Sequence, residues 1–286
     1  MALQSSGAIS ISQIKTELGS SSYSLRTLSA AAGKSTPDAM SEFYGYTGTG
    51  AYIYGSPQLI FDFSRTSYYS NSGTSIADLS GNGNNGTFST GTGNGSATTV
   101  SGYSGSGFLN LPGSSAQLSV RIPDALKPTG TASFTFVVHM KPKGYSYNGN
   151  YPGILGHGSD TQGLSWYLDG DNSRSSVWRD LNCGSNGFDY LNYPSNTGIG
   201  AWSTYFLRSN GTSQQVHVYK NSTLYSGAGA STSCSITGLS GWGFFLGLRY
   251  NNWINADFSY VAIYNSYLST GDLSTIGAAL QGRTPS

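Results

Sequence analysis

The chain has 286 residues with a formal net charge of +1 at neutral pH, and only 9% of them are charged. A composition so close to neutral gives no basic surface to attract nucleic acid, and no apolar stretch approaches the ~20 residues that cross a bilayer. We therefore expect neither nucleic acid nor a membrane as a partner. The first ten residues lack the basic and apolar regions of a secretory signal peptide. The length suits one small module and one larger domain.

Residues 1–46 have the pattern of three short helices, each followed by a glycine. Ser10, with Gln13 three residues on, has the form of a capping box at a helix N-terminus. Thr36 before Pro37 has the form of an N-cap followed by proline at the first helical position. The predicted helices cover about residues 10–19, 24–33 and 36–45.

None of these three helices is long enough to have a core of its own, and helices this short are marginal alone in water. We therefore interpret residues 1–46, called the N-terminal module below, as a docking element for a larger assembly. An ordinary packed N-terminal arm is the alternative. The residues expected to make the attachment are Ile9, Ile11, Ile14, Leu18, Leu25, Leu28, Met40, Phe43 and Tyr44.

After a linker at 47–57 that is rich in glycine and tyrosine, the domain at 58–286 reads as short strands between turns of Gly, Ser and Asn. Many short strands without long helices between them favour a mainly β antiparallel sandwich. Near the end, Ser269 or Thr270 is expected to cap one helix that packs against the edge of the sandwich. The clearest strands are at 58–63, 133–140, 164–168, 204–208, 214–220, 242–249 and 257–264.

Four segments of this domain resemble, in order, the landmarks of the concanavalin A-like, laminin-G-like (pentraxin-type) jelly rolls. Residues 76–87 (IADLSGNGNNGT) are similar to a characteristic turn of that family, and residues 201–205 (AWSTY) to a strand preceded by tryptophan. Residues 217–221 (HVYKN) resemble a hairpin, and residues 258–269 (FSYVAIYNSYLS) the strand and helix that close the domain. The resemblance implies a jelly-roll sandwich over about residues 58–282.

The N-terminal module resembles the start of tailed-phage virion proteins. The likeness lies in residues 6–12 (SGAISIS) and 41–45 (SEFYG). Together the two resemblances imply a virion appendage, a tail fibre or a decoration protein, on the tail or the capsid surface. We expect the N-terminal module to bind other virion proteins, and the chain to be present in many copies or as a homo-oligomer, with a trimer favoured.

The sandwich has no residues that suit an enzyme. Glycoside hydrolases of similar fold need carboxylates about 5 Å apart for retention, and the last glutamate of this chain is Glu42. Asp169 and Asp171 form the one close pair, and Gly170 between them indicates a turn. We expect no enzymatic activity. Cys183 and Cys234 lack metal-site spacing and read as buried thiols, although a pairing stays open.

Binding of a host surface glycan is the alternative function, at the tip of a fibre. Sugar sites combine aromatic faces with amide and carboxylate groups, and the stretch from Trp166 to Tyr193 offers both, with the loop at 250–253 as a second cluster. A core role for the tryptophans is an equal alternative. The residues assigned to this predicted carbohydrate patch are Trp166, Asp169, Asp171, Trp178, Arg179, Tyr190 and Trp253.

A cofactor is not expected, but calcium stays open at the Gly- and Asn-rich turn. Asp78, Asn82 and Asn84 offer the oxygen ligands that hard cations take. A turn stabilised by Asx hydrogen bonds explains the same residues without a metal, and it is the preferred interpretation. The sequence thus favours a non-enzymatic phage structural protein that displays a lectin-like sandwich.

Overall fold

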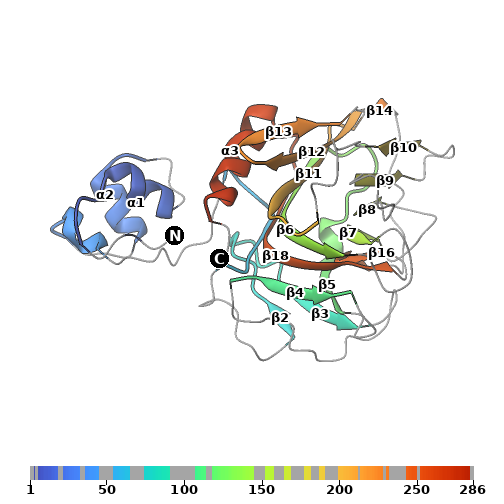
Figure 1. The fold of residues 1–286 in the computed structure, drawn as a ribbon, viewed down its shortest axis with the longest axis horizontal. Helices are drawn as coiled ribbons and strands as arrows, with labels where there is room; N and C mark the ends of the chain where they lie inside the picture. Colours follow the sequence, from blue (N-terminus) through green and yellow to red (C-terminus); the bar gives the residue numbers. More distant parts are fainter. Residues whose placement is uncertain are drawn as a thin grey trace.

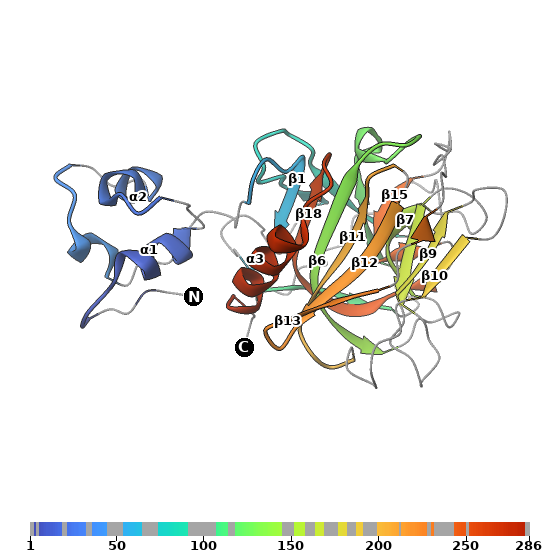
Figure 2. The same cartoon turned by 90° about the horizontal axis from the view of Figure 1, so that it is seen from above.

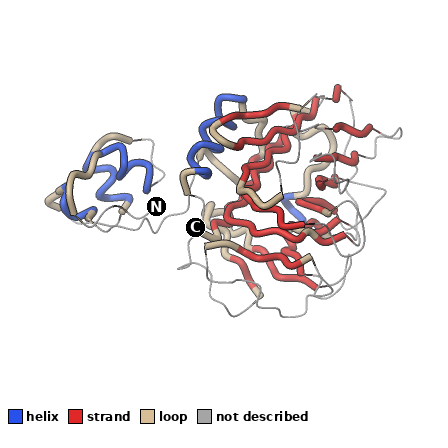
Figure 3. Tube along the Cα trace, in the orientation of Figure 1, coloured by secondary structure: helices blue, strands red, loops and turns tan. Residues whose placement is uncertain are grey.

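The computed structural model confirms a mainly β architecture, in which two antiparallel sheets form a sandwich (Figures 1 and 3). None of the described helices is long and apolar enough to cross a membrane. Cys183 and Cys234 lie outside the described residues. The structure describes residues 3, 6–18, 22–32, 36–44, 54–64, 74–90, 107–113, 118–144, 152–157, 164–168, 177–181, 187–190, 199–211, 213–227, 230–231, 243–249 and 252–283.

The first sheet holds the longest strands. Its spatial order is β1 (Leu59–Asp62), β18 (Asn255–Tyr264), β6 (Phe134–Gly144), β11 (Ser203–Ser209), β12 (Ser213–Lys220) and β13 (Thr223–Ser226), with β4 (Leu109–Pro112) also paired to β18 and β14 (Ala230–Ser231) to β12. The second sheet has the order β10 (Gly187–Tyr190), β9 (Val177–Leu181), β8 (Leu164–Leu168), β7 (Gly153–His157), β15 (Phe244–Leu246), β5 (Leu118–Ile122), β3 (Gly86–Thr90) and β2 (Ser75–Ile76). A short hairpin joins β16 (Leu248–Arg249) to β17 (Asn252–Trp253).

Alternation along β6 shows why the two sheets pack face to face. Phe134, Phe136, Val138 and Met140 are buried in the cluster between the sheets. Val137, one residue out of phase, is buried in a second cluster on the outer face of the first sheet. Because successive side chains of a strand point to opposite faces, one strand contributes to two cores. The predicted alternation of this strand is confirmed.

Helix α3 (Thr270–Gln281) is the cover of that outer face. Ser269 caps it as predicted, because its Oγ accepts a hydrogen bond from the backbone N–H of Asp272 at 3.2 Å. The helix packs against β11, β12 and β13 (Figure 2), which corrects the expectation that it lies at the sandwich edge. The apolar residues buried there together are Ile60, Val137, Phe206, Tyr219, Tyr260, Ala262, Tyr264, Leu273, Ile276 and Leu280.

Gly277 lets α3 approach the sheet closely. A Cβ at this position would lie 2.3 Å from Cγ of Tyr219, far inside van der Waals contact.

The hairpin between β12 and β13 turns through two residues of positive φ, since Asn221 and Ser222 have φ of 48° and 62°. Two residues of positive φ make the type I′ turn that matches the twist of a hairpin, so the predicted hairpin is confirmed.

The helices of the N-terminal module share one core, although none of them is long enough to have one alone. Leu3, Ile14, Leu28 and Phe43 are buried together. Each helix is too short to fold alone, but three amphipathic pieces can cover one another's apolar faces. Its elements are α1 (Ile11–Leu18), α2 (Leu25–Ala31) and a 3₁₀ turn, η1 (Met40–Phe43).

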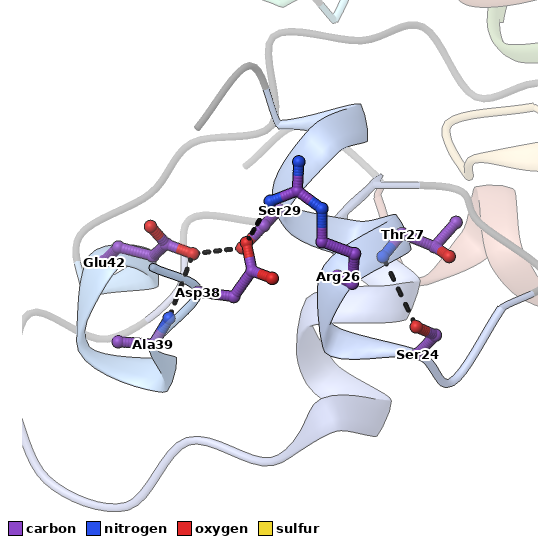
Figure 4. A network of polar contacts seen from close by, with 7 residues as sticks. All are labelled: Ser24, Arg26, Thr27, Ser29, Asp38, Ala39 and Glu42. Atoms are coloured by element: carbon purple, nitrogen blue, oxygen red, sulfur yellow. Dashed lines mark hydrogen bonds and ion pairs between the residues drawn. The ribbon is translucent and has the colours of Figure 1, made fainter. Parts of the chain in front are cut away.

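Polar contacts tie the second and third elements of the N-terminal module together (Figure 4). Arg26 forms an ion pair with Asp38 at 2.7 Å, and the Ser29 hydroxyl donates a hydrogen bond to the Glu42 carboxylate. The capping box of Ser10 and Gln13 agrees with the sequence, and the second helix begins after Ser24, near its predicted start. The third element differs from the prediction, because it begins at Met40 instead of after Thr36, and Ala39 occupies the N-cap position.

Candidate functional site

Two tryptophans of the predicted carbohydrate patch, Trp166 and Trp253, are buried and cannot bind a sugar. Trp166 is fully buried in the core between the sheets, and Trp253 is 1% exposed in a small cluster with Phe245 and Leu248. A ring without an exposed face cannot stack on a sugar, so the structure corrects both assignments to core residues. For Trp166 the reason is the inward alternation of β8, since Leu164, two residues earlier, belongs to the same core.

The rest of the predicted patch is described only in its backbone or not at all. Strands β9 and β10 pair Trp178 with Tyr190 and Arg179 with Asp189. Their side chains lie outside the described part of the structure, as do Asp169 and Asp171 altogether. These assignments therefore stay predictions.

The Gly- and Asn-rich turn is held by the Asp78 carboxylate. Its Oδ1 accepts from the backbone N–H groups of Ile60 and Ser80 at 3.0 and 2.9 Å. Its Oδ2 accepts from the Ser80 hydroxyl at 2.8 Å and the Asn84 N–H at 2.9 Å. The Asn82 side-chain amide donates to the Pro57 carbonyl at 3.0 Å. Four donors on one carboxylate are the pattern of an Asx-stabilised turn, as preferred above, and this network accounts for the residues considered as calcium ligands.

Among the described residues, no three or more His, Cys, Asp or Glu side chains lie close enough together to hold a metal ion. A hollow of about 300 Å³ lies beside the 3₁₀ turn η3 (Asp124–Leu126). The aromatic residues that line it, Phe134 and Phe136, belong to the core, with exposures of 3% and 1%. This hollow therefore offers no exposed aromatic face.

A better candidate lies on the outer face of the first sheet, beyond the part that α3 covers. Three outward-facing side chains form a row across neighbouring strands, because Asn110 on β4 lies opposite Asp257 on β18, and Asp257 lies opposite Lys141 on β6. Their outward direction follows from their neighbours, since Leu109 and Met140 point into the core.

Trp202, just before β11, extends this row with an aromatic surface. Its ring is half-buried and stacks on His139 of β6, with centroids 5.4 Å apart and planes inclined by 13°. Phe108, also half-buried, meets Trp202 edge to face at 6.1 Å. We call Phe108, Asn110, Lys143, Trp202 and Asp257 the Trp202 site.

The polar groups of the Trp202 site are fixed by one another. Lys143 Nζ lies 2.6 Å from Oδ1 of Asp257, and the Asn110 amide donates to the same oxygen at 2.7 Å. The Asp257 side chain is 4% exposed and that of Lys143 is 37% exposed. The carboxylate thus serves as a buried anchor for an ammonium and an amide that reach the surface beside the Phe108 ring, whose centroid lies 5.6 Å from Lys143 Nζ.

His139 supports the Trp202 ring from below in an uncharged state. It is 1% exposed, and its Nδ1 lies 2.9 Å from the Thr204 hydroxyl on the neighbouring strand. Burial lowers the pKa of His139 to about 3, because the protonated ring would lose its hydration. His139 thus has a structural role: it contacts Thr204 across the strands and holds Trp202 in place without adding charge.

Sequence reasoning missed the Trp202 site because its members come from four separated segments. Trp202 itself was noticed as the tryptophan that precedes a strand in the jelly-roll pattern, and not as a binding residue. The signal that could have found it is the register of β6, which places His139, Lys141 and Lys143 on one face. Without the pairing of β6 to β18 and β11, nothing in the sequence joins these residues to Asp257 and Trp202.

The two-sheet sandwich is similar in fold to several solved structures. The chain is similar to domain 4 of AbnA, a GH43 extracellular arabinanase from Geobacillus stearothermophilus, in complex with arabinotriose, at 15% identity and a TM-score of 0.51, over 77% of this chain and 98% of that one. It is also similar to an arabinofuranosidase complexed with arabinofuranosyl-alpha-1,2-xylobiose, at 12% identity and a TM-score of 0.53, over 83% of this chain and 61% of that one.

A GH54 a-l-arabinofuranosidase soaked with a cyclic sulfate inhibitor matches at 13% identity and a TM-score of 0.53, over 77% of this chain and 53% of that one. The chain therefore spans about half the length of that enzyme. No protein-family model matches the sequence, and a comparison with curated proteins finds no relative. At these identities the likeness establishes the sandwich fold and nothing about the site.

Proposed function

We propose that the sandwich is a glycan-binding domain of a non-enzymatic virion appendage, and that its ligand stacks on Trp202. The observation that carries this proposal is the Trp202 site itself. A half-exposed indole held flat by a buried histidine lies beside an amide and an ammonium fixed by a common carboxylate. Sugars present C–H faces to such rings and hydroxyl groups to such donors and acceptors.

The neighbouring structures support the same function by analogy, since one of them is domain 4 of an arabinanase in complex with arabinotriose. The proposal that the chain is not an enzyme is supported by the sequence, because no glutamate follows Glu42. Binding at one shallow site is expected to be weak, so adsorption to a surface would depend on many copies acting together.

The test of glycan binding uses the full chain on an array of oligosaccharides, followed by titration calorimetry on those that bind. Trp202→Ala is expected to weaken binding about five- to thirtyfold, since stacking of a ring contributes roughly 1 to 2 kcal/mol. Tyr225→Ala is the matched control, because Tyr225 is a 37% exposed aromatic residue on β13 of the same sheet. Equal loss in both variants, or no loss in Trp202→Ala, would contradict the proposal.

The N-terminal module is proposed to be the attachment element of the same appendage. Its separate core supports this role, because it gives a unit that can keep its shape without contributing to the sandwich. The contact assignments change, however. Ile14, Leu28 and Phe43 are buried within the module, so they stabilise it and cannot face a partner, whereas Tyr44 is 44% exposed and Tyr23, which the sequence did not single out, is 64% exposed.

The partly buried residues Ile9, Ile11, Leu18, Leu25 and Met40 pack around the core of the N-terminal module. A chain that lacks residues 1–46 is expected to fold and to bind glycan, but to be absent from purified particles when they are analysed by mass spectrometry. Tyr23→Ala with Tyr44→Ala should reduce incorporation with the module still present. Incorporation of the truncated chain at the wild-type level would show that the anchor lies elsewhere.

A further inference from the structure

The row that carries the Trp202 site has more positive than negative charge. Lys141 lies directly opposite Asp257 in the register of β6 and β18. Asp257 nevertheless makes its close ion pair with Lys143, at 2.6 Å. Lys141 is half-buried and forms no ion pair with any described residue. The row thus has two lysines and one described carboxylate, and only Lys143 pairs with it.

The other groups that face Lys141 do not cancel this charge. His139, two residues earlier on the same face of β6, is neutral, since burial lowers its pKa to about 3. Trp202, Phe108 and Asn110 carry no charge. The other described acidic residue in the strands of this sheet is Asp62, which lies on β1 and pairs with Arg283 at 3.5 Å. Arg208, a further cation of this face, is 4% exposed and donates to the Leu268 carbonyl and the Gln215 side chain, so it is not available to a ligand. Lys141 and Lys143 are thus the cations that surround Trp202.

We infer that the glycan bound at the Trp202 site is anionic, a sugar that bears a carboxylate, a sulfate or a phosphate group. The inference rests on the proposed function of the site. Stacking on Trp202 would bring such a substituent close to Lys141, where the ligand supplies the negative charge that the protein lacks. A neutral sugar would cover the ammonium of the half-buried Lys141 without compensating its charge, which costs free energy.

Asp257 does not oppose an anion at this position. Its side chain is 4% exposed, and its Oδ1 accepts hydrogen bonds from both Lys143 and Asn110. The carboxylate is thus shielded from the surface, while Lys143 keeps N–H groups free to turn toward a ligand, because an ammonium has three donors. The site therefore combines a ring for the sugar face with two cations for its substituent.

The test compares matched pairs of soluble probes that differ only in charge, with the full-length chain. One pair is a galacturonate oligomer and its methyl ester, and the second is a sulfated galactan oligomer and its desulfated form. The anionic member of at least one pair is expected to bind about two- to five-fold more tightly at low ionic strength. The preference should shrink in 1 M salt, where the Debye length falls to about 3 Å.

Lys141→Gln is expected to remove the preference, because the anionic probe loses its cation, whereas the neutral probe no longer covers an uncompensated ammonium and should bind as tightly as before or slightly more tightly. Arg121→Gln is the matched control, because Arg121 is a 42% exposed cation on β5 of the other sheet. Thermal unfolding of both variants checks that they fold. Preference for sulfate alone or for carboxylate alone would identify the substituent, and either result supports the inference.

Two outcomes are negative, and they differ in what they overturn. Equal binding of both members of each pair, weakened by Trp202→Ala, would overturn the anionic ligand and leave the glycan-binding function in place. No binding of any glycan that depends on Trp202 would overturn the proposed function and this inference with it.

Discussion

The outer face of the first sheet is divided into two halves that the same strands build differently. On one half, β6, β11 and β12 present Val137, Phe206 and Tyr219, which α3 covers. On the other half, β6 presents His139, Lys141 and Lys143, and β11 is preceded by Trp202. The change occurs within β6, between Val137 and His139.

The difference between these two halves shows how a sandwich can leave part of one face exposed for binding. An apolar half requires a cover, because a large exposed apolar patch is unstable in water or attracts other molecules. The half with the Trp202 site needs none, because its surface is largely polar, with Trp202 stacked on a buried histidine and Lys143 and Asn110 held at Asp257. We expect the covered half to contribute mainly to stability and the open half mainly to binding.

The largest predicted effect is a loss of stability at low pH, and it tests the role of His139, which lies under Trp202 in the open half. In the unfolded chain His139 takes up a proton below its ordinary pKa of 6.5, whereas in the folded chain it does so only below about 3. The unfolded state therefore binds protons first as the pH falls, and stability is lost from about pH 6.5 downward. Between pH 7 and pH 4 this residue alone is expected to lower the free energy of unfolding by about 3 kcal/mol.

Urea titrations of wild type and His139→Gln at both pH values measure this contribution. The variant should lose less stability than wild type on acidification. His217, whose pKa burial lowers to about 4, acts in the same direction and remains in both proteins. An unchanged pH dependence in His139→Gln would mean that the ring under Trp202 takes up its proton at the same pH in the folded and the unfolded chain, which would contradict its burial.

The next effect tests the covered half. Gly277→Val is expected to lower the free energy of unfolding by about 2 to 3 kcal/mol, because its Cβ would overlap the Tyr219 ring and force α3 away from the sheet. Ala278→Val is the matched control, since Ala278 is the next residue of the helix and is exposed. Glycan binding should survive in both. Equal stability of the two variants would show that α3 does not pack as described.

A smaller effect is expected at the junction that leads into α3. Arg208 is 4% exposed, and its guanidinium donates to the Leu268 carbonyl and to the Gln215 side chain. It also lies over the Tyr267 ring, 4.3 Å from the centroid. Arg208→Ala removes the donor to the Leu268 carbonyl and the contact with the Tyr267 ring, and it leaves Gln215 Oε1 with the Tyr267 hydroxyl as its donor, so a loss of about 2 kcal/mol is expected in chemical denaturation. A change of less than about 0.5 kcal/mol, the usual size for surface positions, would contradict this role.

Much of the sandwich could be predicted from the sequence because its strands alternate clearly. The segments 133–140 and 257–264 correspond to β6 and β18, and Ser269 was identified as the cap of α3. Local patterns of this kind report which residues face a core. They do not report what covers the opposite face, which is why α3 was expected at the sandwich edge.

The candidate site was less predictable, since it depends on pairing between distant segments. Trp166 and Trp253 were plausible sugar platforms by residue type, yet both are buried, because aromatic residues fill cores as readily as they line sites. Conversely, Trp202 and Phe108 are far apart in sequence and meet only through the register of β4, β18 and β6. The buried apolar residues of the N-terminal module were misread for a similar reason, since three helices can bury one another.

The most direct test of the central claim follows the indole N–H signals of the five tryptophans by NMR during titration with a glycan that the chain binds. The Trp202 signal is assigned by its absence in Trp202→Phe. This signal is expected to shift with saturation, while those of the buried Trp166 and Trp253 stay in place. A shift confined to Trp178, with Trp202 unaffected, would place the ligand on the β8–β10 side of the second sheet and contradict the account.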